Sequence, residues 1–179
     1  MIHAEFLTGT EPICLNAPGV VIGAGEAHHR TVARVGVSDL DGPRLRIDIQ
    51  GHSEWSCFRG VSTQDGLVAI GFQECLYVVH LESLRVTQTR LEGYFGHIYP
   101  ASAFQEPATL PFSFLVAGAS QLVCIGRDGS IAWIAQDLGI DGVTVESIEH
   151  QIITGAGEWD PPGGWRPFAL ALGSGTRVR

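Results

Sequence analysis

The chain contains no lysine, so all 11 of its basic residues are arginines; they stand against 19 acidic residues, and the formal net charge is −8. Without lysine the protein cannot form a Schiff base, hold a phosphate through a Walker-type lysine or use a Ser–Lys nucleophile pair. A surface that follows nucleic-acid phosphates needs a basic stripe. The sequence shows none, and we therefore expect no nucleic-acid partner.

The sequence also lacks closely spaced cysteines. Its four cysteines, Cys14, Cys57, Cys75 and Cys124, are far apart. This spacing does not indicate a zinc knuckle or a thioredoxin-like site. Cys75 and Cys124 lie inside apolar runs, where a free cysteine behaves as a small buried hydrophobe. We predict that both are buried and reduced, as is usual in a reducing compartment.

No window approaches the roughly 18 uninterrupted apolar residues of a membrane-spanning helix. The N-terminus, Met1–Glu5, does not have the basic start and apolar stretch of a secretory signal. These features predict a soluble protein of the bacterial cytoplasm without a membrane partner.

Glycine, in contrast, is abundant, with 23 of 179 residues, roughly double the average frequency. Such a content suits many short strands and tight turns better than helices, in which each glycine costs about 1 kcal/mol. No stretch shows a helical period over 11 residues. We predict one all-β domain over residues 1–179, with a strand content well above about 35%.

Two segments share one pattern without a gap, residues 67–86 and 114–133. Each reads as an apolar run with a glycine, a tight connection, a second apolar run, a turn cluster and a third strand. Gly71 in the first segment matches Gly118 in the second. The tetrapeptide Gly-Ala-Gly-Glu, at residues 23–26 and 155–158, adds a unit near each end of the chain.

The four glycines that mark these units, Gly23, Gly71, Gly118 and Gly155, lie roughly 40 to 50 residues apart. That period is typical of propellers built from four-stranded blades, so we predict a small or partial β-propeller-like fold. A two-sheet β-sandwich or barrel is the alternative. Between the first two units, alternating residues at 31–37 and 45–49 flank a turn and predict a hairpin.

The segments Leu76–Ser83 and Leu122–Trp133 resemble the inner hairpins of pyrroloquinoline-quinone-type β-propeller repeats. Those repeats combine an apolar run ending in glycine, a second strand, a turn with Gly, and a strand with Trp. The resemblance covers two to four short units. It implies the fold but no quinone or other cofactor, because one fold serves many functions.

Two patterns near the first unit suggest ligand sites. Residues 18–28 look like the start of a dinucleotide-binding loop, but His28 replaces its third glycine and the residues that follow alternate like a strand. Glu26, His28 and His52 carry the ligand types that several first-row metals prefer, although their spacing is not diagnostic. No Gly-x-Ser-x-Gly elbow marks a nucleophile.

The most unusual segment runs from Glu158 to Arg166 and interrupts the fourth unit. It holds Trp159 and Trp165, two of the four tryptophans, together with Asp160 and two adjacent prolines. Rigid exposed aromatics flanked by charge are typical of recognition surfaces. The alternative is that both indoles fold inward and cover the end of the core.

These observations predict a non-enzymatic binding module with a protein partner and no cofactor. The candidate binding residues are Glu158, Trp159, Asp160, Trp165 and Arg166. An acidic, small domain without catalytic motifs is also typical of immunity proteins that neutralise toxins. The alternative is a metal-dependent enzyme on an all-β scaffold that uses Glu26, His28 and His52. The sequence leaves the oligomeric state open.

Overall fold

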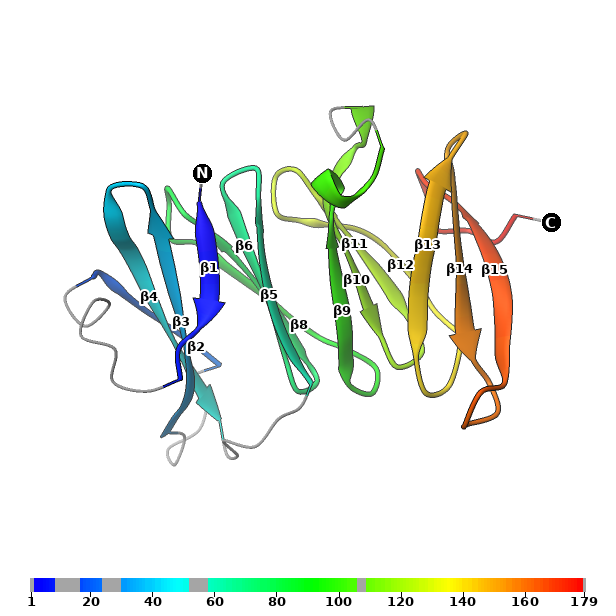
Figure 1. The fold of residues 1–179 in the computed structure, drawn as a ribbon, viewed down its shortest axis with the longest axis horizontal. Coiled ribbons are helices and arrows are strands. Elements are labelled where there is room, and N and C mark those ends of the chain that lie inside the picture. Colours follow the sequence, from blue (N-terminus) through cyan, green and yellow to red (C-terminus); the bar gives the residue numbers. More distant parts are fainter. Residues whose placement is uncertain (1, 9–16, 24–29, 52–57, 106–108, 179) are drawn as a thin grey trace.

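The computed structural model describes residues 2–8, 17–23, 30–51, 58–105 and 109–178. These residues form fifteen strands and one short 3-10 helix, arranged as four small sheets (Figure 1). Strands account for 62% of the described residues. The prediction of an all-β protein is therefore confirmed, whereas the barrel alternative is wrong because the sheets do not close into a barrel.

Each sheet is built from strands that follow one another in the chain. Sheet 1 has the strand order β1-β3-β4-β2. Its strands are β1 (His3–Phe6), β2 (Gly19–Ile22), β3 (Arg30–Asp39) and β4 (Gly42–Gly51). Sheet 2 is an antiparallel meander of β5 (Arg59–Gln64), β6 (Leu67–Phe72), β7 (Cys75–His80) and β8 (Val86–Arg90).

Sheet 3 repeats the meander of sheet 2. It contains β9 (Phe95–Pro100), β10 (Phe112–Gly118), β11 (Leu122–Gly126) and β12 (Ile131–Ala135), with the 3-10 helix η1 (Ala101–Ala103) between β9 and β10. Sheet 4 has three strands, β13 (Val143–Glu149), β14 (Ile152–Glu158) and β15 (Trp165–Ala171). The four sheets stand in a row, with the two ends of the chain at opposite sides (Figure 1).

The core is divided into three layers, one between each pair of successive sheets. The first layer packs Val35 and Ile47 of sheet 1 against Ile70 of sheet 2. The second joins sheets 2 and 3, and the third joins sheets 3 and 4. The first strands of neighbouring sheets contact one another along one edge, β1 with β5, β5 with β9 and β9 with β13. This order is propeller-like, and the row stays open.

The predicted repeat corresponds to real units. The connection after Gly71 is the turn between β6 and β7, and the connection after Gly118 is the turn between β10 and β11. The hairpin predicted around residues 31–49 is β3 and β4. Gly23 is misplaced in the alignment. It follows β2, which pairs in parallel with β4 at the edge of sheet 1, whereas the other three glycines lie in the second strand of their sheets.

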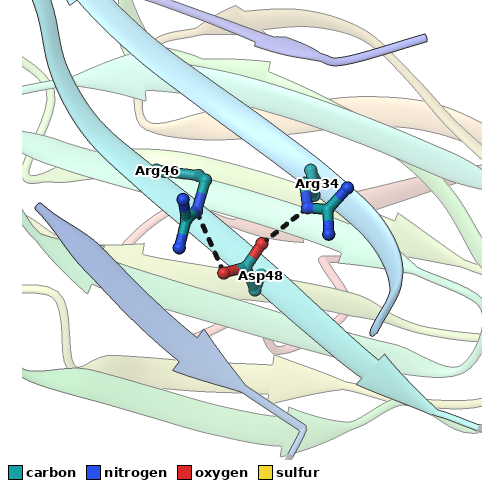
Figure 2. A network of polar contacts seen from close by, with 3 residues as sticks. All are labelled: Arg34, Arg46 and Asp48. Carbon is teal, nitrogen blue, oxygen red and sulfur yellow. Dashed lines mark hydrogen bonds and ion pairs between the residues drawn. The ribbon is translucent and has the colours of Figure 1, made fainter. Parts of the chain in front are cut away.

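The outer face of sheet 1 carries a network of charged side chains (Figure 2). Asp48 on β4 accepts from Nε of Arg34 at 2.9 Å through Oδ1 and from Nε of Arg46 at 3.0 Å through Oδ2. The carboxylate of Asp48 is nearly buried, and two guanidinium groups therefore compensate the cost of removing it from water.

The outer edge of sheet 4 is partly closed by the C-terminal residues. Val178 N–H donates to the Ala169 carbonyl at 2.9 Å, and Ala171 N–H donates to the Thr176 carbonyl at 2.8 Å. Further along the same edge of β15, Pro167 has no backbone N–H that could donate to another strand. Proline on an edge strand blocks the addition of another strand. The edge of β15 is thus protected against pairing.

The two described cysteines differ in their exposure. Cys124 on β11 is buried, and burial raises the pKa of its thiol to about 12. Cys75 is only half-buried because it is the first residue of β7, next to the turn that follows β6. Both thiols are free. The prediction of a buried thiol is confirmed for Cys124 and wrong for Cys75.

We expect Cys75 to react with a thiol reagent in the folded protein and Cys124 to react only after unfolding. The thiolate is the reactive species, and burial suppresses it at Cys124 up to a pH near 12. Peptide mapping after a short alkylation at neutral pH measures both sites separately. Equal labelling of Cys75 and Cys124 in the native protein would contradict the burial of Cys124.

Among the described residues, no helix is long and apolar enough to cross a bilayer.

Candidate functional site

The segment between β14 and β15 is a loop, as the sequence predicts, and Glu158 fixes its shape from within. Glu158 is the last residue of β14, and its Oε1 accepts from the N–H of Gly163 at 2.6 Å. Its backbone carbonyl accepts from Ile140 N–H at 2.7 Å. One acceptor position of the Glu158 carboxylate is therefore used by the loop itself.

The loop packs against the connection between β12 and β13 because two glycines allow the backbones to approach. A side chain at Gly157 would overlap the Leu138 carbonyl. At Gly142, a Cβ would lie 3.2 Å from Cη2 of Trp165, so the indole lies against the bare backbone. The two connections thus form one unit at the lower end of sheet 4 (Figure 1).

The candidate residues on this loop are largely open to solvent. Trp165 is 45% exposed, and Asp160 and Arg166 are also exposed. Trp159 is half-buried, with the Arg166 guanidinium carbon 5.8 Å from the centre of its ring. That distance permits a cation–π interaction. The structure therefore brings Trp159 and Arg166 together and leaves Trp165 available for contact.

A second set of aromatic residues lies next to this loop. The hydroxyl of Tyr94 donates to Asp141, whose backbone carbonyl and Oδ1 are both within reach, the latter at 2.9 Å. On its other side, Tyr94 stacks on Phe58 with ring centres 4.1 Å apart. Ile140, the neighbour of Asp141, is 56% exposed. Phe58 is exposed as well.

We name this region the base surface; it consists of Phe58, Tyr94, Ile140, Asp141, Trp159, Asp160, Trp165 and Arg166. Most of its residues come from the connections that precede β5, β9, β13 and β15, and Trp165 and Arg166 are the first two residues of β15. These connections lie at the lower end of the molecule because β5, β9 and β13 all begin there (Figure 1). The sequence analysis found only the last connection, since nothing in the sequence links Phe58 or Tyr94 to it.

Tyr94 is the titratable group of the base surface with a clear shift. Burial, the hydrogen bond to Asp141 and the negative charges of Asp141 and Glu158 together raise the pKa of Tyr94 to about 12. The pKa of Tyr94 in the folded protein is higher than the ordinary value of about 10. The neutral hydroxyl therefore stabilises the fold, and this contribution is complete below about pH 10. The contribution is lost as the pH rises through 12.

We expect Tyr94 to stay protonated in the folded protein at about pH 11, where a free tyrosine is mostly ionised. Phenolate absorbance of the wild type should then equal that of Tyr94→Phe in the folded state and exceed it after unfolding in urea. Asp141→Asn removes one negative charge and should lower the pKa of Tyr94. A folded-state difference between wild type and Tyr94→Phe at this pH would contradict the prediction.

The opposite end of the molecule contains a groove of about 690 Å³. Its lining includes Leu45, Asp65, His80, Arg85 and Arg127. Asp65 accepts from the buried Ser113 hydroxyl at 2.8 Å and lies 3.5 Å from Arg127 Nη1. Arg85 Nη2 contacts His80 Nε2 at 2.8 Å and donates to the carbonyl of Asp128 at 3.1 Å. These contacts connect the turns of sheet 2 to sheet 3 at this end of the molecule.

The candidate metal ligands Glu26, His28 and His52 lie outside the described residues. In the part of the chain that the structure describes, no group of three or more His, Cys, Asp or Glu side chains could hold a metal ion. The metal-dependent alternative therefore depends on segments about which the structure says nothing.

Comparison of the sequence with protein-family models gives no match, and comparison with curated proteins gives no match either.

Proposed function

We propose that this protein is a non-enzymatic binding module that contacts a protein partner through the base surface. The observation that carries the proposal is the exposure of Trp165 and Ile140 next to one connection: the Trp165 ring lies against Gly142, and Ile140 precedes Asp141, which binds Tyr94. Backbone hydrogen bonds hold this connection in place. Ile140 N–H donates to Glu158, and Gly142 N–H donates to the Ala119 carbonyl at 2.9 Å. A preorganised surface loses little conformational entropy when it binds.

The composition of the base surface favours a protein partner. Trp, Tyr and Arg are the residue types that dominate binding energy in protein interfaces, and all three are present here. Asp160 and Arg166, both exposed, supply a polar rim that can pair with charges on the partner. The net charge of −8 favours encounter with a basic partner. An immunity-type role, with a toxin as that partner, stays a prediction.

A photo-crosslinking amino acid placed at Ile140 tests the proposal. In lysate of the source organism, we expect one discrete cross-linked protein that disappears when Trp165→Ala is added. The matched control carries the same amino acid at Leu84, which is also an exposed large hydrophobic residue but lies in the turn after β7, at the opposite end of sheet 2. No cross-link at Ile140, or an identical one at Leu84, would contradict the proposal.

A further inference from the structure

Strand β12 is the outer edge of sheet 3, and its sequence lacks the residues that usually protect such an edge. It pairs with β11 only, and its sequence Ile-Ala-Trp-Ile-Ala contains neither a charged residue nor proline. The register shifts at Ala132, whereas residues 133–135 pair regularly with β11, and Ile134 is 42% exposed. Exposed edges are usually protected by charge, by proline or by a covering segment. No described segment pairs with the outer side of β12.

The outer edges of sheets 2 and 4 do carry such protection. On sheet 4, residues 176–178 lie along β15 as a short extended segment, and Ala171 N–H donates to the Thr176 carbonyl at 2.8 Å. On sheet 2, the edge strand β8 is polar and ends in Arg90, whose Nη2 lies 3.0 Å from Oε2 of Glu74. The apolar edge of β12 thus differs from both neighbouring edges.

The backbone N–H and C=O of Ile134 point toward this open side. At the turn between β10 and β11, Gly118 N–H donates to the Gln121 carbonyl at 2.9 Å. Bonded and non-bonded pairs alternate along antiparallel strands, so Val123, two residues further on, directs its N–H and C=O toward β10. Val123 lies opposite Ile134. Ile134 therefore directs its own N–H and C=O away from β11, and no described residue bonds to them.

The side chain of Ile134 lies on the side of sheet 3 that faces sheet 2. Directly opposed residues share one face of a sheet, and Val123, opposite Ile134, belongs to the core layer between sheets 2 and 3. Ile131 packs against the same layer. A strand added beside β12 would therefore place an apolar side chain next to Ile134 and remove its exposed surface from water.

We propose that β12 binds an extended segment of a protein partner as an additional strand of sheet 3. An outward N–H and C=O on one residue match the donors and acceptors that an extended backbone offers. Sheet 4 shows the same kind of occupant, because there residues 176–178 of the chain itself line the outer edge. The partner segment carries β-branched or aromatic residues, which pack well beside Ile134. This inference does not depend on the proposed function, because β12 and the base surface share no residue.

Hydrogen exchange of the backbone amides, measured by NMR on the full chain, tests the proposal. In the protein alone, the Ile134 amide should exchange at least about 10-fold faster than the amides of Trp133 and Ala135, which face β11. The probe is a synthetic heptapeptide of alternating Thr and Val. Its addition should slow exchange at Ile134 at least about 10-fold. The same peptide with every amide N-methylated should give no protection, because it has no N–H to donate.

One variant and a matched control test the position of the site. Ile134→Lys keeps the backbone but places a charge on the edge, and it should weaken peptide binding at least about 10-fold. Leu84→Lys is the control, because Leu84 is also 42% exposed but lies in the turn after β7. It should bind the peptide like wild type. Equal weakening by both variants would show that the peptide binds elsewhere and would overturn the proposal.

Three further results would overturn it. Slow exchange at Ile134 in the protein alone would show that the edge is already occupied. If light scattering then gives twice the 19.2 kDa mass of one chain, a second copy is the occupant. Absence of protection by the peptide at about 1 mM would show that the edge does not accept a strand. Equal binding of the N-methylated peptide would show that side chains, and not backbone hydrogen bonds, hold the peptide.

Discussion

Replacing Gly71 by alanine is expected to lower the free energy of unfolding by about 3 kcal/mol, near the upper end of the cost of overpacking a core. Gly71 lies on β6 in sheet 2, and a Cβ at this position would overlap the ring of Phe95. Phe95 is fully buried at the start of β9, and its backbone N–H is bound to the Gln73 carbonyl at 2.6 Å. The ring therefore has no room to move away.

The midpoint and slope of urea denaturation measure this effect. The matched control is Gly173→Ala, because a Cβ at Gly173 meets nothing within 4 Å. It should change stability by no more than about 0.5 kcal/mol. A Gly71→Ala variant as stable as Gly173→Ala would show that the Phe95 ring does not lie on β6.

The two positions should also be coupled. Phe95→Ala removes a fully buried aromatic side chain and should cost about 3 to 5 kcal/mol by itself. In the double variant the methyl group introduced by Gly71→Ala occupies part of the vacated space, so the total loss should be smaller than the sum of the single losses. Strict additivity would contradict direct contact between the two residues.

Replacing Trp165 by alanine is expected to abolish partner binding with a loss of at least about 2 kcal/mol of binding free energy, typical of a tryptophan hot spot. The same variant should lose no more than about 1 kcal/mol of stability, because nearly half of this side chain is exposed. Trp159→Ala should behave similarly, with a somewhat larger stability loss, since Trp159 is half-buried.

Thermal melts of the tryptophan variants distinguish recognition from core packing. Trp133→Ala is the control for a tryptophan with a structural role. Its Nε1 donates to the Leu172 carbonyl at 2.9 Å, and its ring packs on Gly175. We expect it to cost about 3 kcal/mol. If Trp159→Ala and Trp165→Ala both destabilise the protein as much as Trp133→Ala, the indoles support the fold and the recognition role is refuted.

The sequence alone determined the class of the fold and most of its inner strands. β6, β7, β10 and β11 read as continuous apolar runs because these strands are buried on both faces, between two core layers. The position of the β14–β15 loop was also readable, because Pro161, Pro162 and two glycines cannot continue a strand. Local physical chemistry is sufficient for such features.

The sequence does not predict β5 and β9, because these two strands depend on pairing with neighbouring strands. β5, with the sequence Arg-Gly-Val-Ser-Thr-Gln, has no alternating apolar pattern and is only half-buried at its inner positions. β9 contains a glycine and ends in proline. Both are the first strands of their sheets, and backbone pairing with β6 and β10 makes them strands. At such positions, backbone hydrogen bonds to the neighbouring strand outweigh a low intrinsic strand propensity.

The base surface, likewise, was decided by the tertiary structure. Phe58, Tyr94 and Asp141 are separated by tens of residues, and they meet only because successive sheets place the connections before their first strands at the same end. Glu158 is a candidate binding residue by sequence, and only the fold of its loop shows that its Oε1 accepts from Gly163 N–H. Residue types revealed which side chains suit recognition, whereas chain topology decided which of them lie together and which are already bonded.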